Sequence, residues 1–103
     1  MTYKIPHAID MNLIGEITKE RAYQIDKWGS DADLNVNTPM DWVGYIAHHS
    51  SRWFTGGFAP YSPDELKKFR SQMVKVATLA VAAIQSTDAI LEGQVNRPDV
   101  LRA

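Results

Sequence analysis

Two glutamates, Glu16 and Glu20, lie four residues apart in a segment with helical periodicity, and Gln24 follows four residues later. This spacing puts the side chains on one face of a helix, where the two carboxylates could converge on a divalent cation such as Mg²⁺. The same pattern is also typical of a solvated face whose charges are balanced by neighbouring cations. The acidic residues that could complete such a site are Asp31, Asp33 and Asp41.

The run Asp-Ala-Asp-Leu-Asn at 31–35 has the composition of the start of a calcium-binding EF-hand loop. The pattern then fails, because Val36 stands where the loop needs glycine and Trp42 where it needs glutamate. Side chains of this kind hydrogen-bond their own backbone and interrupt helices. We therefore interpret residues 30–37 as a turn-forming loop.

Two histidines, His48 and His49, are adjacent in the chain. On a helix they point about 100° apart, so they cannot chelate one metal as a pair four residues apart would. No residue spacing indicates a third group that would orient a serine–histidine couple for nucleophilic catalysis. Spacing alone therefore assigns this pair neither a metal nor a catalytic role.

Cations cluster around the start of the third predicted helix, with Lys67, Lys68 and Arg70 in its first turns, Lys75 further on and Arg52 before it. Such groups could bind a phosphate or an acidic protein surface. They could equally form a solvated face. The helix dipole disfavours cations near an N-terminus, which favours the ligand role.

Aromatic residues are numerous for a small chain. Most should pack in the core, although one could stack on a nucleobase at the mouth of a site. The residues considered are Trp28, Trp42, Tyr45, Trp53 and Tyr61.

Helical spacing of apolar residues and start and stop signals predict the elements that position these groups. The first helix spans about 11–28, with Asp10 as its N-cap and Gly29 after its end. A second spans about 39–55, because Thr38-Pro-Met-Asp41 forms a variant capping box ahead of it.

A second capping box, Ser62-Pro-Asp-Glu65, predicts a long third helix at about 63–92. Its Ala-rich run at 77–84 should be buried on all sides, partly by a second subunit. Residues 94–103 should fray or form a short docking turn. The expected fold is all-α: one domain over 1–103, an antiparallel bundle of three principal helices with the third long.

Composition narrows the function classes. The chain has 103 residues, the usual size of one domain, and 45% hydrophobic residues. Its formal charge of −1 argues against broad binding to nucleic acid or an anionic membrane. With no cysteine, no signal-peptide pattern and no apolar stretch of about 18 residues, we expect a cytoplasmic protein without a membrane partner. The small size and the Ala-rich helix favour a homodimer.

Two stretches resemble a known family: E-x-x-x-E-R-x-x-Q-x-x-K-W-G at 16–29 and M-V-K-V-A-x-L-A-V-A-A-I at 73–84. With a Trp-led helix between them, they resemble small phage and prophage proteins of the MazG-like type, within the all-α nucleoside triphosphate pyrophosphohydrolases. The similarity covers roughly residues 13–90. In that family, the resemblance implies, a Glu-Glu-x-x-Glu motif on the second helix and an acidic residue followed by another ligand on the third hold Mg²⁺ ions.

The chain departs from this pattern at each metal ligand. The alignment places His48-His49-x-x-Arg52 at the first motif and Gln72-x-x-Lys75 at the second. Cations replace carboxylates, so Mg²⁺ loses its anionic oxygen ligands. The resemblance then implies a cavity lined by donors suited to phosphate or carboxylate, with Glu20 and Gln24 opposite.

Three hypotheses follow. The first is a non-hydrolytic, phage-type MazG-like protein that needs no metal or other cofactor. It binds a nucleotide, another anionic ligand or a host protein through a ligand-binding set of His48, His49, Arg52, Gln72, Lys75, Glu20 and Gln24. The second is an active, Mg²⁺-dependent nucleoside triphosphate pyrophosphohydrolase with a shifted acidic site at Glu16 and Glu20. The third is a pure protein-interaction module, such as an inhibitor of host defence.

Overall fold

The computed structural model describes residues 5, 8–52 and 58–102, and these residues form helices without strands. The helices are α1 (Met11–Trp28), α2 (Asp31–Asn35), α3 (Pro39–Ser51) and α4 (Pro63–Leu91). The all-α prediction and the long last helix are therefore confirmed. The bounds of α1 match the prediction, and α4 ends one residue before the predicted position.

The helix starts follow the predicted capping. The Asp10 carboxylate accepts a hydrogen bond from the Asn12 backbone N–H at 2.7 Å. Thr38 with Asp41 and Ser62 with Glu65 form two reciprocal capping boxes, each with proline in the first turn. These contacts satisfy backbone donors that a helix start would otherwise leave unpaired.

The structure bears on two further predictions, the loop over 30–37 and the end of the second helix. The expectation of a loop over 30–37 is wrong, because Asp31–Asn35 forms the short helix α2. The helix forms although its residues favour turns, since tertiary contacts override weak local preferences. The predicted end of the second helix at 55, together with Trp53, lies outside the described residues; Arg52 is the C-cap of α3 as described.

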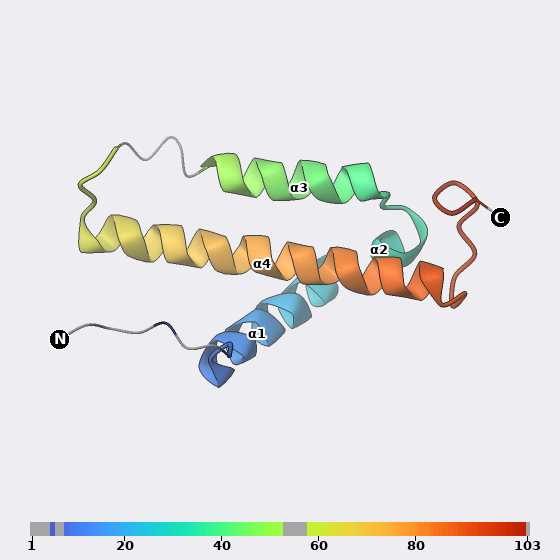
Figure 1. Ribbon diagram of the computed structural model, residues 1–103, viewed down its shortest axis with the longest axis horizontal. Helices are drawn as coiled ribbons and strands as arrows, with labels where there is room; N and C mark the ends of the chain where they lie inside the picture. Colours follow the sequence, from blue (N-terminus) through green and yellow to red (C-terminus); the bar gives the residue numbers. More distant parts are fainter. Residues whose placement is uncertain (1–4, 6–7, 53–57, 103) are drawn as a thin grey trace.

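The long helix α4 is the centre of the molecule (Figure 1), and α1, α2 and α3 each pack against it. The helix α3 runs antiparallel to α4, whereas α1 crosses α4 obliquely (Figure 1). The short helix α2 lies beside the C-terminal half of α4 (Figure 1). The bundle is therefore antiparallel only in its α3 and α4 pair.

The core is small and lies between α3 and α4. Trp42, Leu79 and Ala82 form its buried cluster, and Ile46 and Ala83 pack against it. Within a single chain residues 77–84 are not buried on all sides, because Ile84 is 59% exposed, and the predicted burial by a second subunit stays a prediction. Three helices around α4 leave one of its faces uncovered.

The helix α4 is also long and apolar enough to cross a membrane by length and composition, with 33% of its apolar window buried. A core helix of a soluble protein meets the same criterion, and the packing of α1, α2 and α3 on α4 is compatible with a small soluble protein.

Candidate functional site

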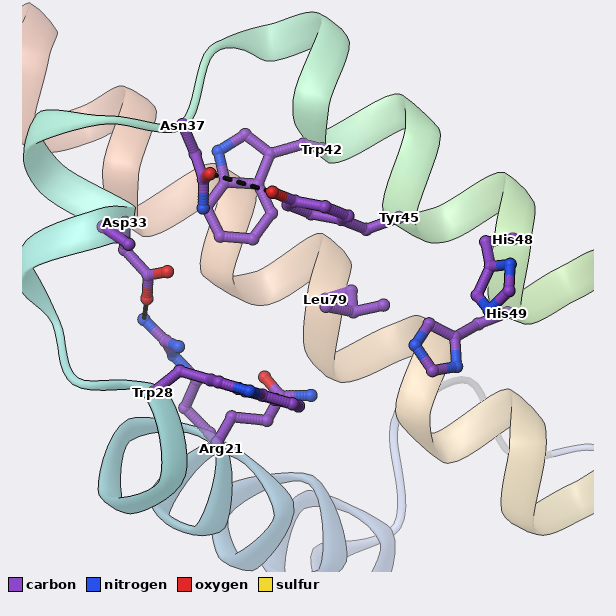
Figure 2. Close-up of a pocket in the computed structure, with 11 residues that line it drawn as sticks. Arg21, Trp28, Asp33, Asn37, Trp42, Tyr45, His48, His49 and Leu79 are labelled. Carbon is purple, nitrogen blue, oxygen red and sulfur yellow. Dashed lines mark hydrogen bonds and ion pairs between the residues drawn. The ribbon is translucent and has the colours of Figure 1, made fainter.

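A cavity of about 460 Å³ lies between α1 and α3, within the size range of small-molecule sites. Figure 2 shows Trp42 and Tyr45 of α3 facing Trp28 and Arg21 of α1 across it, with Leu79 of α4 behind. The lining residues are Arg21, Gln24, Trp28, Ala32, Asp33, Asn37, Trp42, Tyr45, His48, His49 and Leu79. Its lining therefore combines aromatic rings with polar groups.

Trp42 and Tyr45 form an aromatic wall on α3, which packing and one hydrogen bond hold in place. Trp42 is 6% exposed, and its ring meets that of Tyr45 edge to face, with centroids 5.9 Å apart. The Tyr45 hydroxyl donates to Asn37 Oδ1 at 3.1 Å (Figure 2). Across the cavity, Trp28 is 60% exposed and lies under the Lys27 ammonium. A planar ligand could enter beside Trp28 and stack against a wall already in place.

The short helix α2 closes one end of the cavity, and side chains from two other helices hold it there. Arg21 of α1 pairs with Asp33 at 2.9 Å and donates to Gln85 of α4 at 3.0 Å. Ser86 of α4 donates to the Asp33 carbonyl at 2.6 Å. The Asp33 carboxylate is therefore engaged by a cation rather than available for a metal.

The tail holds the connection between α2 and α3 through Arg97, whose side chain is almost fully buried. Its guanidinium donates to the carbonyls of Leu34, Val36 and Asn37 at 3.0–3.3 Å and pairs with Asp99. Hydrogen bonding to Asp99 raises the pKa of Arg97 and keeps it charged. Arg97 thus supports the backbone of Asn37, whose side chain orients Tyr45.

The other end of the cavity is formed by His48 and His49 (Figure 2), whose rings meet edge to face at 5.4 Å. Gln72 of α4 donates from Nε2 to the His49 carbonyl at 2.8 Å, and the same nitrogen lies 3.0 Å from His49 Nδ1. Burial is the main cause of the lowered pKa of His49, electrostatic interactions with His48, Arg52 and Lys75 lower it further, and Glu20 acts in the opposite direction. The imidazole is therefore held neutral near physiological pH.

These contacts show where the predicted ligand set lies. His48, His49 and Gln24 line the cavity, and Gln72 contacts His49 from behind. Glu20 and Lys75 instead line a second hollow of about 520 Å³ between α1 and α4. Their charges nevertheless act on the pKa of His49, which Glu20 raises and Lys75 lowers. The charge of Arg52 also lowers the pKa of His49.

The alternative acidic site does not assemble among the described residues. Arg70 makes a bidentate ion pair with Glu16, and this hydrogen bonding is the main cause of the lowered pKa of Glu16. Asp41 is used in the capping box of α3. Within the described part of the chain, no three histidine or acidic side chains form a group that could hold a metal ion.

No protein-family model, no curated protein and no solved structure matches this chain. The MazG-like resemblance therefore stays a prediction, and the function must be argued from the cavity.

Sequence reasoning missed two residues that shape the cavity, Asn37 and Arg97. Asn37 was treated as part of a loop, although an asparagine just before a helix cap could have suggested a local hydrogen-bonding role. Arg97 lies in a tail without periodicity, and its partners are about 60 residues away in the chain. No local pattern signals such a contact.

Proposed function

We propose that this chain binds a nucleotide, or a similar ligand with a planar ring and an anionic group, without metal and without hydrolysing it. The ring would lie in the cavity between Trp28 and the wall formed by Trp42 and Tyr45. The anionic group would lie near His49, toward Arg52 and Lys75.

The observation that carries the proposal is the state of Gln24. Five polar or charged side chains are buried among the described residues, and four of them hydrogen-bond to other protein groups: Asn37, Thr78, Ser86 and Arg97. Gln24 is 7% exposed, lines the cavity, and has no protein hydrogen-bond partner in the described structure. Among the described residues no fully buried polar side-chain atom lacks a partner, so the Gln24 amide is open to the cavity, where a ligand with a complementary donor and acceptor edge could bind it.

Charge distribution supports the position of the anionic group. Arg21 is paired with Asp33 at the α2 end, so that end offers no excess charge. The positive charges of Arg52 and Lys75 act at the histidine end, against the single opposing charge of Glu20. A phosphate or carboxylate is therefore favoured at the histidine end.

The same contacts disfavour the hydrolytic alternative. Glu16 is paired with Arg70, and Asp33 with Arg21. Freeing either carboxylate for Mg²⁺ would leave a cation unpaired, so metal binding would compete with existing ion pairs. The shifted acidic site thus lacks support from the geometry.

The test is thermal unfolding of chelator-treated protein with ATP, GTP, CTP, UTP and their mono- and diphosphates, each with and without Mg²⁺. We expect at least one nucleotide to raise the melting temperature equally well without metal, since a ligand of the native state stabilises it by about 2.7 kcal/mol at a hundredfold excess over Kd. A shift that requires Mg²⁺ would overturn the metal-free site and favour the hydrolase. If no nucleotide produces a shift, the proposal fails and the cleft becomes a candidate surface for a protein partner.

A charge-reversal pair locates the anionic end. In the double variant R52E and K75E, the shift should disappear while the far-ultraviolet circular dichroism stays helical. The matched control is K68E with R102E, which changes the net charge equally at exposed positions that line neither hollow. Equal loss in both double variants would mean that only overall charge matters, and would refute the site.

We also propose that the uncovered face of α4 binds a second copy of the chain. Ile84 and Leu91 are 59% and 65% exposed and lie seven residues apart, a spacing that keeps them on one helical face. Ala77 continues this face at the same interval toward the start of the helix. Small and apolar side chains at heptad spacing suit close helix-to-helix packing, and a second α4 offers the complementary stripe.

Sedimentation velocity tests this assembly. The wild-type protein should sediment as a dimer, and I84E as a monomer. The control M40E places the same charge at an exposed apolar residue of α3, 75% exposed, and should leave the dimer intact. A monomeric wild-type protein at high micromolar concentration would overturn the proposal.

A further inference from the structure

The contact between Gln72 and His49 joins α4 to α3 and also determines how the two side chains share their hydrogens. The Gln72 atom 2.8 Å from the His49 carbonyl must be the amide nitrogen, because a carbonyl oxygen only accepts hydrogen bonds. This fixes the orientation of the Gln72 carboxamide without reference to any other group.

The amide nitrogen carries two hydrogens, and the His49 carbonyl uses one. The second hydrogen is available to His49 Nδ1, 3.0 Å from the same nitrogen. Nδ1 can accept it only if its lone pair is free. A neutral imidazole with a free lone pair on Nδ1 carries its proton on Nε2.

The surroundings of His49 oppose a second proton. Around the ring, α3 contributes His48 and Arg52, α4 contributes Lys75, and α1 contributes Glu20 as the one opposing charge. Protonation at Nδ1 would also place two donors, Nδ1–H and the Gln72 amide, against each other at 3.0 Å. The neutral form with the proton on Nε2 is therefore favoured twice, by charge and by hydrogen bonding.

The Nε2–H group has no acceptor among the described protein groups, and the His49 ring projects from α3 toward the cavity (Figure 2). We propose that Gln72 fixes His49 as the Nε2–H tautomer, so that the cavity offers a hydrogen-bond donor at this end and selects ligands with an acceptor there. Gln72 is thus a specificity-determining residue that acts through His49. The part of this inference that concerns the ligand rests on the proposed function.

The acceptor is a carbonyl oxygen, an unprotonated ring nitrogen or a phosphate oxygen of the bound molecule. A ligand that presents an N–H at this point would face the Nε2–H donor and be rejected, since two opposed donors leave both unsatisfied. The donor carries no charge, so it does not depend on acid to form.

The experiment is a long-range ¹⁵N–¹H correlation spectrum of the imidazole nitrogens, which distinguishes protonated from unprotonated ring nitrogens. Comparison with H49Q, whose spectrum lacks them, assigns the His49 signals among those of the three histidines. We expect the free protein at pH 7.5 to show Nε2 protonated and Nδ1 unprotonated for His49. A protonated Nδ1, or averaged signals from mixed tautomers, would overturn the inference, and this measurement needs no variant of Gln72 to fold.

Variants test whether Gln72 is the cause. In Q72M, which removes both hydrogen bonds but keeps a side chain of similar length, the His49 signals should become those of mixed tautomers. In Q72E, the carboxylate accepts rather than donates, so the proton should move to Nδ1 and the ring should protonate more readily. The matched control Q85E changes an amide to a carboxylate on the same helix at a residue bonded to Arg21, and should leave His49 unchanged. An unchanged His49 tautomer in both Gln72 variants would refute the role of Gln72.

Ligand binding separates this inference from the proposed function. With the nucleotide that gives the largest thermal shift, and at a pH where the ¹⁵N spectrum shows a neutral His49 ring in Q72E, this variant should lose about tenfold in affinity, the value of one lost hydrogen bond to the ligand. Unaltered affinity in Q72E would overturn the specificity role. If no nucleotide binds the wild-type protein but the expected tautomer is seen, the proposed function alone fails and the tautomer assignment stands.

Discussion

Trp42 and Trp28 line opposite sides of the same cavity, yet the structure gives them different roles in stability. Trp42 is 6% exposed and belongs to the core cluster with Leu79 and Ala82. Trp28 is 60% exposed, and its described partner is the Lys27 ammonium, 4.9 Å from the ring centroid. Replacing each by alanine therefore separates support of the fold from contact with the ligand.

The expected magnitudes are far apart. Truncating a buried tryptophan costs about 3–5 kcal/mol, and the free energy of unfolding of an ordinary domain is about 5–15 kcal/mol, so W42A should remove roughly a fifth or more of the stability. For a chain of this size the melting temperature should fall by roughly 12 °C or more. W28A removes an exposed ring and one cation–π contact, and should cost at most about 1 kcal/mol.

W28A should affect ligand affinity much more than it affects stability. Loss of a stacking ring costs about 1–3 kcal/mol of binding, so W28A should weaken nucleotide binding by roughly 5- to 150-fold while the fold is retained. Urea unfolding followed by circular dichroism measures stability, and isothermal titration calorimetry measures affinity. The reasoning is refuted if W28A destabilises the fold as much as W42A does, or if W28A binds nucleotide as tightly as the wild type.

Three further predictions follow from single contacts. The pKa of His49 is lowered in the folded chain, so the unfolded chain binds this proton more readily. The free energy of unfolding should therefore fall as the pH drops below about 6.5. In urea titrations, H49Q should make this dependence on pH less steep. S62A removes one half of the capping box of α4 and should cost about 1 kcal/mol in the same assay, whereas S62D should restore most of it; equal stability of all three proteins would contradict the cap. In R97K, the carbonyls of Leu34, Val36 and Asn37 lose most of their guanidinium contacts, so amide hydrogens over 34–37 should exchange faster while those of α1 keep their wild-type rates.

Helix starts could be predicted from the sequence because their signals are local. Thr38 with Asp41 and Ser62 with Glu65 lie three residues apart, and the hydrogen bonds that define each box form within one turn. The helix α2 could not be predicted. Its residues favour turns, and it is held by Arg21, Ser86 and Arg97 from three distant parts of the chain.

The burial of α1 could not be predicted from periodicity either. Ile14, Ile17, Ile25 and Trp28 recur at helical spacing, yet Ile17 is only half-buried and the other three are exposed, while Gln24 is buried. Periodicity assumes that a helix lies on a continuous core, whereas α1 crosses α4 obliquely and borders a cavity (Figure 1). At such a border, burial depends on which residue faces the cavity and not on which residue is apolar.

Part of the predicted ligand set lines the cavity because helical spacing and cavity lining coincide over one turn. His48 and His49 come from α3 and Gln72 from α4, and the antiparallel packing of these helices brings them together. Glu20 and Gln24 are also one turn apart, but they diverge, with Gln24 in the cavity and Glu20 in the second hollow with Lys75. His49 lines the cavity, and the charges of Glu20 and Lys75, which line the second hollow, both act on the pKa of its ring. A ligand in the proposed orientation, with its ring beside Gln24 and its anionic group toward Lys75, would place that anionic group near the Nε2–H donor of His49.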